Sequence, residues 1–275
     1  GNVLENSWAD LPTGQSGYAI LLTVRLESGA APQADVSDIT ITNNIIRDVG
    51  AGITLSGHDN PGLSLQSKRI NISNNLFDDI SGPDYGDGNL AGPNDGIFIK
   101  IGDPSDILID HNTVLQSGAI TWAYGITLNI AITNNIFHCF ISDGGYQGIY
   151  GPNFAQNGNG PMGAYFPGIT DANQHFHKNV LIGGPADKYS NYNTQSQNYF
   201  PANVAGVQFQ DYANGGNDYH LYALKNTSAY KNAASDGKDI GVDFAQLDSA
   251  LAVKLACLPT VATQVLPDEK SVQIL

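Results

Sequence analysis

Ile39-Thr40-Ile41-Thr42-Asn43-Asn44 is a phrase that returns along the chain with the same alternation of apolar and polar residues. Its other copies are Ile70-Asn71-Ile72-Ser73-Asn74-Asn75, Ile107-Leu108-Ile109-Asp110-His111-Asn112, Ile130-Ala131-Ile132-Thr133-Asn134-Asn135 and the weaker Phe176-His177-Lys178-Asn179. Alternation with period two is typical of a strand with one buried face. A repeated phrase indicates one supersecondary unit stacked on itself, so we expect a solenoid of short strands.

The last asparagine of each phrase marks a bend between strands. These asparagines stand at positions 2, 44, 75, 112, 135 and 179. The shortest step, from Asn112 to Asn135, is 23 residues. That is too short for a strand, a crossover helix and a second strand, which need about 30 residues. A buried asparagine in every turn is expected to bond the backbone of neighbouring coils and form a ladder.

A second strand follows each asparagine bend. It reads Gly52-Ile53-Thr54-Leu55, Gly96-Ile97-Phe98-Ile99, Ala119-Ile120-Thr121-Trp122 and Gly148-Ile149-Tyr150, with Ala19-Ile20-Leu21-Leu22 upstream. Strict alternation predicts one inward column of Ile20, Ile53, Ile97, Ile120 and Ile149, and it also turns Trp122 inward. Pairs such as Ile45-Ile46 and Leu76-Phe77 supply a third strand after the asparagine bend.

The Ile-x-Ile phrases, the asparagine ladder and the Gly-Ile strands resemble the right-handed parallel β-helix of the pectate-lyase-like superfamily, over about residues 2 to 182. The resemblance implies an all-β, single-stranded solenoid whose substrate lies on the outer face of the Gly-Ile strand. It does not fix the activity, because this architecture hosts lyases, hydrolases, epimerases, phage tailspikes and non-catalytic surface proteins.

Two regions follow from the pattern. Residues 1–182 form the coils, and residues 183–275 form a loop-rich C-terminal region packed on the solenoid. Within it, Asp243 is expected to cap a helix that carries Phe244, Leu247, Leu251 and Leu255 on one face. We expect this amphipathic segment to close the open end of the last coil. Because Asn2 falls at a bend, we also expect further coils before this sequence.

The composition restricts the partners. Charged residues make up 14%, below the usual level of about 25%, and the net charge is −14. Nucleic-acid binding needs a basic footprint and is disfavoured. A polyanionic glycan is repelled unless calcium or a local basic patch intervenes. No apolar run is long enough to span a membrane. Cys139 and Cys257 pair only if the C-terminal helix folds back beside the coils, and the pattern fits a secreted bacterial protein.

The outer face of the Gly-Ile strand is the predicted binding surface. Its candidate substrate-binding residues are Thr54, Ser56, Phe98, Thr121, Tyr124 and Tyr150. Lys100 is the only cation among the outward positions, and a lysine with a lowered pKa can take the proton beside a uronate carboxylate. Asp95 and Asp103 flank it in sequence and are expected to raise its pKa. The alternative is a solvated lysine whose stem rests on Phe98.

Acidic residues supply the other catalytic candidates. His58-Asp59 and Asp103 follow the Gly-Ile strand in neighbouring coils, and two carboxylates about 5 Å apart form a retaining glycosidase pair. Asn94-Asp95-Gly96 and Gly57-His58-Asp59 only partly match the acidic motifs of polygalacturonase-like hydrolases. The alternative is a set of turn-capping aspartates. The catalytic candidates are Lys100, His58, Asp59, Asp95 and Asp103.

A calcium ion is the one cofactor that the sequence offers. Asp84, Asp87 and Asp95, with Asn94, share a glycine-rich loop of the kind that Ca²⁺ accepts. The alternative is an ordinary acidic turn. His111 is expected to replace an asparagine hydrogen bond in its bend. His175 and His177 point outward together, but no third metal ligand accompanies them.

The sequence therefore predicts a carbohydrate-active protein, lyase-like or hydrolase-like, whose partner is a polysaccharide or oligosaccharide. A non-catalytic surface, adhesion or glycan-binding module, self-associating through its solenoid ends, is the main alternative. A trimeric tailspike-like depolymerase is a third.

Overall fold

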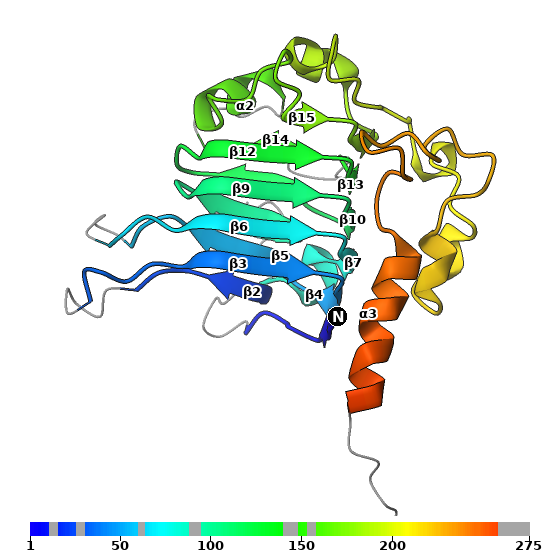
Figure 1. Ribbon diagram of the computed structural model, residues 1–275, viewed down its shortest axis with the longest axis horizontal. Helices are drawn as coiled ribbons and strands as arrows, with labels where there is room; N and C mark the ends of the chain where they lie inside the picture. The colour runs from blue at the N-terminus through cyan, green and yellow to red at the C-terminus, as the bar shows by residue number, and fades with distance from the viewer. Residues whose placement is uncertain are drawn as a thin grey trace, which may run out of the picture.

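The computed structural model describes residues 1–10, 16–25, 31–59, 64–87, 95–139, 148–152 and 158–257, the last five without side chains. Its strands form three parallel sheets, and successive strands of each sheet come from successive coils (Figure 1). The first sheet holds β1 (Val3–Glu5), β4 (Ile45–Val49), β7 (Leu76–Ile80), β10 (Thr113–Gln116), β13 (Ile136–His138) and β16 (Val180–Ile182). The stacked strands confirm the predicted solenoid and are consistent with a parallel β-helix.

The other two sheets have five strands each. The second holds β2 (Tyr18–Leu22), β5 (Ala51–Ser56), β8 (Ile99–Gly102), β11 (Thr121–Ala123) and β14 (Ile149–Tyr150). The third holds β3 (Ser37–Thr42), β6 (Lys68–Ser73), β9 (Ser105–Asp110), β12 (Leu128–Thr133) and β15 (Phe176–His177). The repeated phrases form the third sheet in register, so that Ile39, Ile70, Ile107 and Ile130 make one core column.

The predicted asparagine ladder runs through the interior of the bends. Asn112 is typical: its Oδ1 accepts from the backbone N–H and from the Nδ2 of Asn75, each at 3.0 Å, and its Nδ2 donates to Ile72 O at 2.9 Å. The same pattern joins Asn2, Asn44, Asn75, Asn112, Asn135, Asn179 and Asn198. The ladder satisfies backbone groups that the bends would otherwise leave unpaired.

From Asn44 to Asn198, the residue before each ladder asparagine adopts the left-handed conformation, which asparagine tolerates better than most residues. These residues are Asn43, Asn74, His111, Asn134, Lys178 and Gln197, with φ between 51° and 58°. His111 occupies the predicted asparagine slot. His111 Nε2 lies 3.3 Å from the Asp236 carboxylate. In the next coil, Asn134 Oδ1 makes a comparable contact, because it accepts a hydrogen bond from Ser235 N at 2.8 Å. The column therefore anchors the C-terminal part of the chain.

The last coil is closed by a different segment from the one that the sequence indicated. Helix α2 (Asn159–Tyr165) and the 3₁₀ segment η1 (Ala186–Tyr192) cover it, and Met162, Phe166 and Tyr189 are fully buried in the main core. Helix α3 (Phe244–Cys257) instead runs along the side of the first sheet (Figure 1). The expectation of an α3 end cap was therefore wrong.

Helix α3 lies on the first sheet because that sheet is apolar on both faces. Ile45, Leu76, Ile136 and Val180 project outward from it and form a second core with the C-terminal segment, residues 204–257. Asp243 caps the helix as predicted, with its Oδ1 accepting from Gln246 N at 3.1 Å. The remaining short elements are α1 (Gly82–Tyr85), η2 (Val204–Gly206), η3 (Tyr212–Asn214) and η4 (Tyr219–Tyr222).

Two further predictions concern the whole chain. Among the helices in the described ranges, none is long and apolar enough to cross a membrane. Cys139 is a fully buried free thiol, and burial raises its pKa. The sequence leaves open whether the two cysteines pair, and the structure does not test it, because the Cys257 side chain lies outside the described residues.

Candidate functional site

The outer face of the second sheet carries one row of side chains that crosses successive coils. In-register pairing places Leu21, Thr54, Lys100, Trp122 and Tyr150 side by side, one from each strand. Thr54, Lys100 and Trp122 are partly exposed, whereas Tyr150 is only 9% exposed. Neighbouring members of such a row are about 4.8 Å apart, so the row can follow an extended ligand.

Two predicted binding residues face the opposite way. Phe98 is fully buried, and its ring centroid lies 4.9 Å from that of Phe77 in the core. Thr121 is also fully buried and pairs with Ile99 and Ile149, which are core residues. Both assignments to the outer face were therefore wrong.

The physical reason is a break in alternation before strands β8 and β11. Phe98 and Ile99 both point inward, and so do Ile120 and Thr121. Ile97 instead belongs to a small outer cluster. The break turns Trp122 to the outer face, whereas strict alternation had placed it in the core.

Lys100 makes cation–π contacts with the rings of Trp122 and Tyr124. The Lys100 Nζ lies 4.5 Å from the Trp122 ring centroid and 5.6 Å from that of Tyr124. Ring faces attract a cation, but burial of the side chain lowers the pKa of Lys100. No carboxylate in the described part of the chain lies within ion-pair distance of Lys100. The expectation that Asp95 and Asp103 would raise its pKa was wrong.

His58 and Asp103 form a close pair at the end of this face. His58 Nδ1 lies 2.6 Å from Asp103 Oδ2, and the His58 backbone N–H donates to Asp103 Oδ1 at 3.3 Å. The Tyr124 ring covers Gly102, where a Cβ would come within 2.2 Å of it. Burial, and then the Asp103 charge, raise the pKa of the Tyr124 phenol. Tyr124 thus links Lys100 to the histidine–aspartate pair.

Asp59 has different partners. Its backbone N–H donates to Ser64 Oγ at 3.0 Å, and its Oδ1 lies 3.6 Å from Nη1 of the exposed Arg25. Asp59 and Asp103 are therefore each engaged with a basic side chain, Arg25 and His58 respectively. A two-carboxylate hydrolase centre stays a prediction.

In the described part of the chain, the three loop aspartates take part in turn contacts. Asp84 accepts from Ser81 Oγ at 2.6 Å, and the Asp84 backbone N–H donates back to that oxygen at the start of α1. Asp95 is buried, and its Oδ1 accepts from Asp87 N at 3.2 Å. Among the described residues, no three His, Cys, Asp or Glu side chains are grouped as a metal site needs. These contacts match the alternative of an acidic turn, and Asn94 lies outside the described residues.

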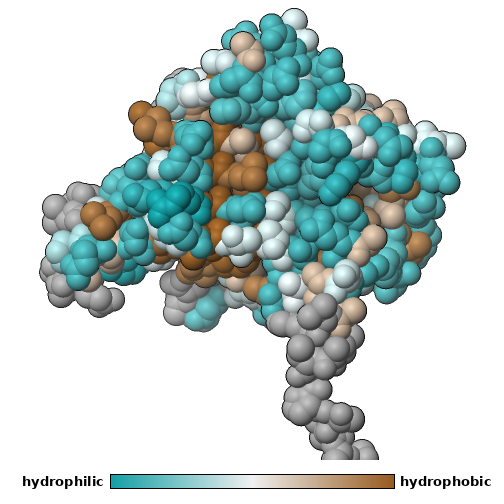
Figure 2. Space-filling view, viewed as in Figure 1, coloured by the Kyte–Doolittle hydropathy of each residue, from teal (hydrophilic) through white to brown (hydrophobic). Residues whose placement is uncertain are grey.

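The remaining candidates are distributed as follows. Ser56 is partly exposed and Tyr124 is 42% exposed, so both are accessible on the predicted face. His177 pairs in register with Thr133 but is only 8% exposed, whereas His175 is partly exposed. Figure 2 shows a narrow apolar band on the third-sheet side, and no catalytic candidate was predicted there.

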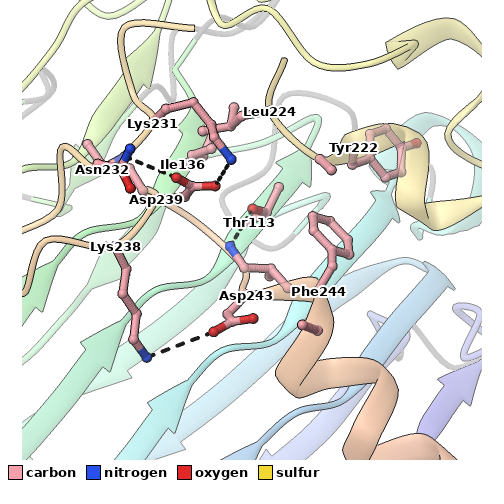
Figure 3. Close-up of a pocket in the computed structure, with 14 residues that line it drawn as sticks. Thr113, Ile136, Tyr222, Leu224, Lys231, Asn232, Lys238, Asp239, Asp243 and Phe244 are labelled. Atoms are coloured by element: carbon pink, nitrogen blue, oxygen red, sulfur yellow. Dashed lines mark hydrogen bonds and ion pairs between the residues drawn. The ribbon is translucent and has the colours of Figure 1, made fainter. Parts of the chain in front are cut away.

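A separate cavity of about 420 Å³ opens between the first sheet and the C-terminal segment (Figure 3). Its two lysines face carboxylates: Lys231 Nζ lies 2.6 Å from Asp239 Oδ2, and Lys238 Nζ lies 3.9 Å from Asp243 Oδ2. Because these charges are paired and the first sheet is covered there, we interpret the cavity as a packing gap.

Comparison with protein-family models, with curated proteins and with solved structures gave no significant match. The fold and the side-chain geometry therefore carry the functional argument.

Proposed function

We propose that this protein is a carbohydrate-active protein with a right-handed parallel β-helix of the pectate-lyase-like type. In this proposal the glycan lies along the outer face of the second sheet. Sugar rings pack their C–H faces on aromatic rings, and hydroxyl groups bond polar side chains such as Thr54 and Ser56. The row from Leu21 to Tyr150 crosses five strands and supports an extended ligand.

The leading activity is β-elimination in a uronate-containing polysaccharide. The observation that carries it is Lys100, which lies on Trp122 and Tyr124 without a carboxylate partner among the described residues and has a lowered pKa. As a neutral amine, Lys100 takes the proton beside the uronate carboxylate. The electron pair forms a carbon–carbon double bond while the glycosidic C–O bond breaks. Tyr124, whose raised pKa keeps its phenol protonated, returns a proton to the departing oxygen.

Local charge supports an acidic substrate. The chain as a whole has a net charge of −14 and repels polyanions at long range. Lys100, once charged, and the exposed Arg25 supply cations on or beside the proposed face. Screening limits the long-range repulsion to about 8 Å at physiological ionic strength, so the charges on this face matter more to a bound uronate than the net charge of the chain.

A non-catalytic glycan-binding module is the second candidate. The pairing of His58 with Asp103 favours this candidate, because each side chain is occupied by the other rather than directed at a substrate. The described residues also hold no cluster of three or more His, Cys, Asp or Glu side chains that could bind a calcium ion and so neutralise a uronate carboxylate. In either case we propose that the protein is secreted by a bacterium, which recovery from culture medium would test.

Incubation with a panel of uronate polysaccharides tests the leading activity. Ultraviolet absorbance of the new double bond should rise with the native protein and stay flat with Lys100→Ala. Lys68→Ala, on the third sheet, is the matched control and should keep full activity. Reducing ends without a double bond would indicate hydrolysis, which Asp103→Asn should abolish.

Affinity electrophoresis in the same glycans separates the two candidates. Retardation without turnover would support the binding module and exclude the lyase. Neither retardation nor turnover with any glycan would refute the proposed function as a whole.

A further inference from the structure

Trp8 is a large aromatic side chain held rigidly at the surface. It is 59% exposed, yet its Nε1–H donates to Asp48 O at 3.1 Å. Its ring also stacks on Tyr85, with centroids 5.9 Å apart and planes inclined by 8°. An indole that is fixed on one side and open on the other offers a flat apolar surface without a further loss of rotamer freedom on binding.

Three successive coils build this platform. The Tyr85 hydroxyl donates to Asp79 Oδ2 at 2.9 Å, and Tyr85 O accepts from Ala9 N at 2.8 Å. Gly50 lies between them, at the corner where β4 of the first sheet passes into β5 of the second. A Cβ on Gly50 would come within 2.6 Å of Tyr85 O, so the close approach requires glycine.

Carboxylates border the rings. Asp48 and Asp79 occupy equivalent positions on β4 and β7, because their neighbours pair in register, and both have positive φ. Arg47, the cation beside them, is bound to Glu5 at 2.7 Å, and its Nε lies 3.9 Å from Asp48 Oδ2. Carboxylate oxygens accept hydrogen bonds from hydroxyl groups and repel an anionic ligand, so the surroundings favour a neutral, hydroxyl-rich molecule.

We propose that Trp8 and Tyr85 form a second carbohydrate-binding site, which takes a neutral pyranose ring of a glycan at the corner between the first and second sheets. The ring packs its C–H face on Trp8, and its hydroxyls donate to the Asp48 and Asp79 carboxylates. This site does not depend on Lys100 and has the opposite charge preference.

The two tryptophans of the chain allow the two sites to be observed separately. Trp122→Phe leaves Trp8 as the only indole, and Trp8→Phe leaves Trp122. Each variant is titrated with neutral hexasaccharides of glucose, xylose, mannose and galactose, and with oligogalacturonate. A neutral hexasaccharide should change the fluorescence of Trp122→Phe and leave that of Trp8→Phe unchanged.

Calorimetry with the responding hexasaccharide then tests the role of the indole. Trp8→Ala should raise Kd by about tenfold or more, which corresponds to about 1.4 kcal/mol. If Trp8→Ala does not fold, Trp8→Leu keeps an apolar side chain without the aromatic face and should weaken binding similarly. No response of Trp8 to any neutral hexasaccharide, or unchanged affinity in the folded variant, overturns the proposal. The Trp122 signal reports the Lys100 face independently, so failure at one site leaves the other open.

Discussion

His138 makes the stability of the protein depend on pH in a direction that can be calculated. Its side chain projects from β13 under Tyr212, with ring centroids 6.0 Å apart, and only 8% of the residue is exposed. Burial lowers its pKa from 6.5 to about 4, although the backbone hydrogen bond with Gln116 opposes the shift. The folded protein therefore binds a proton at His138 less readily than the unfolded chain.

The sign and the size follow from proton linkage. The stability that depends on a neutral His138 is fully present above pH 6.5. It is lost as pH falls from 6.5 to about 4, because the unfolded chain takes up the proton first. The pKa difference corresponds to a loss of about 3 kcal/mol below pH 4, since each pKa step is worth about 1.4 kcal/mol. At about pH 5.5 the loss is about 1 kcal/mol, because the unfolded histidine is then mostly protonated and the folded one is not.

Denaturant unfolding at several pH values tests this calculation. His138→Gln removes the titrating group, so its free energy of unfolding should fall less steeply between pH 7 and pH 5 than that of the native protein, by about 1 to 2 kcal/mol. His220→Gln is the control of opposite sign, because Asp218 and Asp248 raise the pKa of His220 despite its partial burial. Parallel pH profiles for the native protein and His138→Gln would refute the reasoning.

Three further outcomes are expected. Asn112→Ala should lower the free energy of unfolding by about 3 to 5 kcal/mol, because it removes ladder hydrogen bonds and leaves the Asn75 N–H unpaired, whereas Asn217→Ala, at an exposed asparagine without a positive φ, should change it little in the same denaturant titration. Asp243→Ala should cost about 1 kcal/mol in thermal unfolding through loss of the α3 cap, and an unchanged Tm would contradict that role. If Lys100 is the base, the elimination rate should rise with pH through a midpoint below 10.5, and a rate independent of pH would exclude a titrating lysine.

The repeated elements of the fold were predictable from sequence because each coil restates them. Alternating isoleucines and terminal asparagines gave the third sheet and six ladder positions, since stacking makes equal sequence positions equal in space. Asn198 extends the ladder without an Ile-x-Ile phrase before it, so the pattern offered no signal for it. Ladder asparagines that end a repeated phrase could be predicted, whereas Asn198 could not, because no such phrase precedes it.

The position of α3 was missed although a signal existed. Ile45-Ile46 and Leu76-Phe77 are consecutive apolar pairs, and such pairs indicate a strand buried on both faces. Both pairs lie on the first sheet, with one member in each core. The Trp8–Tyr85 contact had no comparable signal, because it joins residues that are 77 positions apart, and neither lies on a paired strand.

The candidate site depends on the break in inward–outward alternation before β8 and β11, which the alternation rule did not predict. Phe98 lies between Gly52 and Ile120 in neighbouring coils: Ile53 N donates to Phe98 O at 2.8 Å, and Ile99 N donates to Ile120 O at 3.1 Å. A Cβ on Gly52 would come within 2.4 Å of Phe98 O, so the first of these coils needs glycine at this point.

Parallel in-register strands keep their hydrogen bonds only if every coil makes the same adjustment, so the break propagates from β8 to β11. The shared break places Lys100 beside Trp122. With uninterrupted alternation from Ile97 and Ile120, Lys100 would pair with Ala123 instead, and it would lack the aromatic surface that buries it. The packing of Phe98 in the core therefore determines which residue meets Lys100 on the opposite face of the sheet.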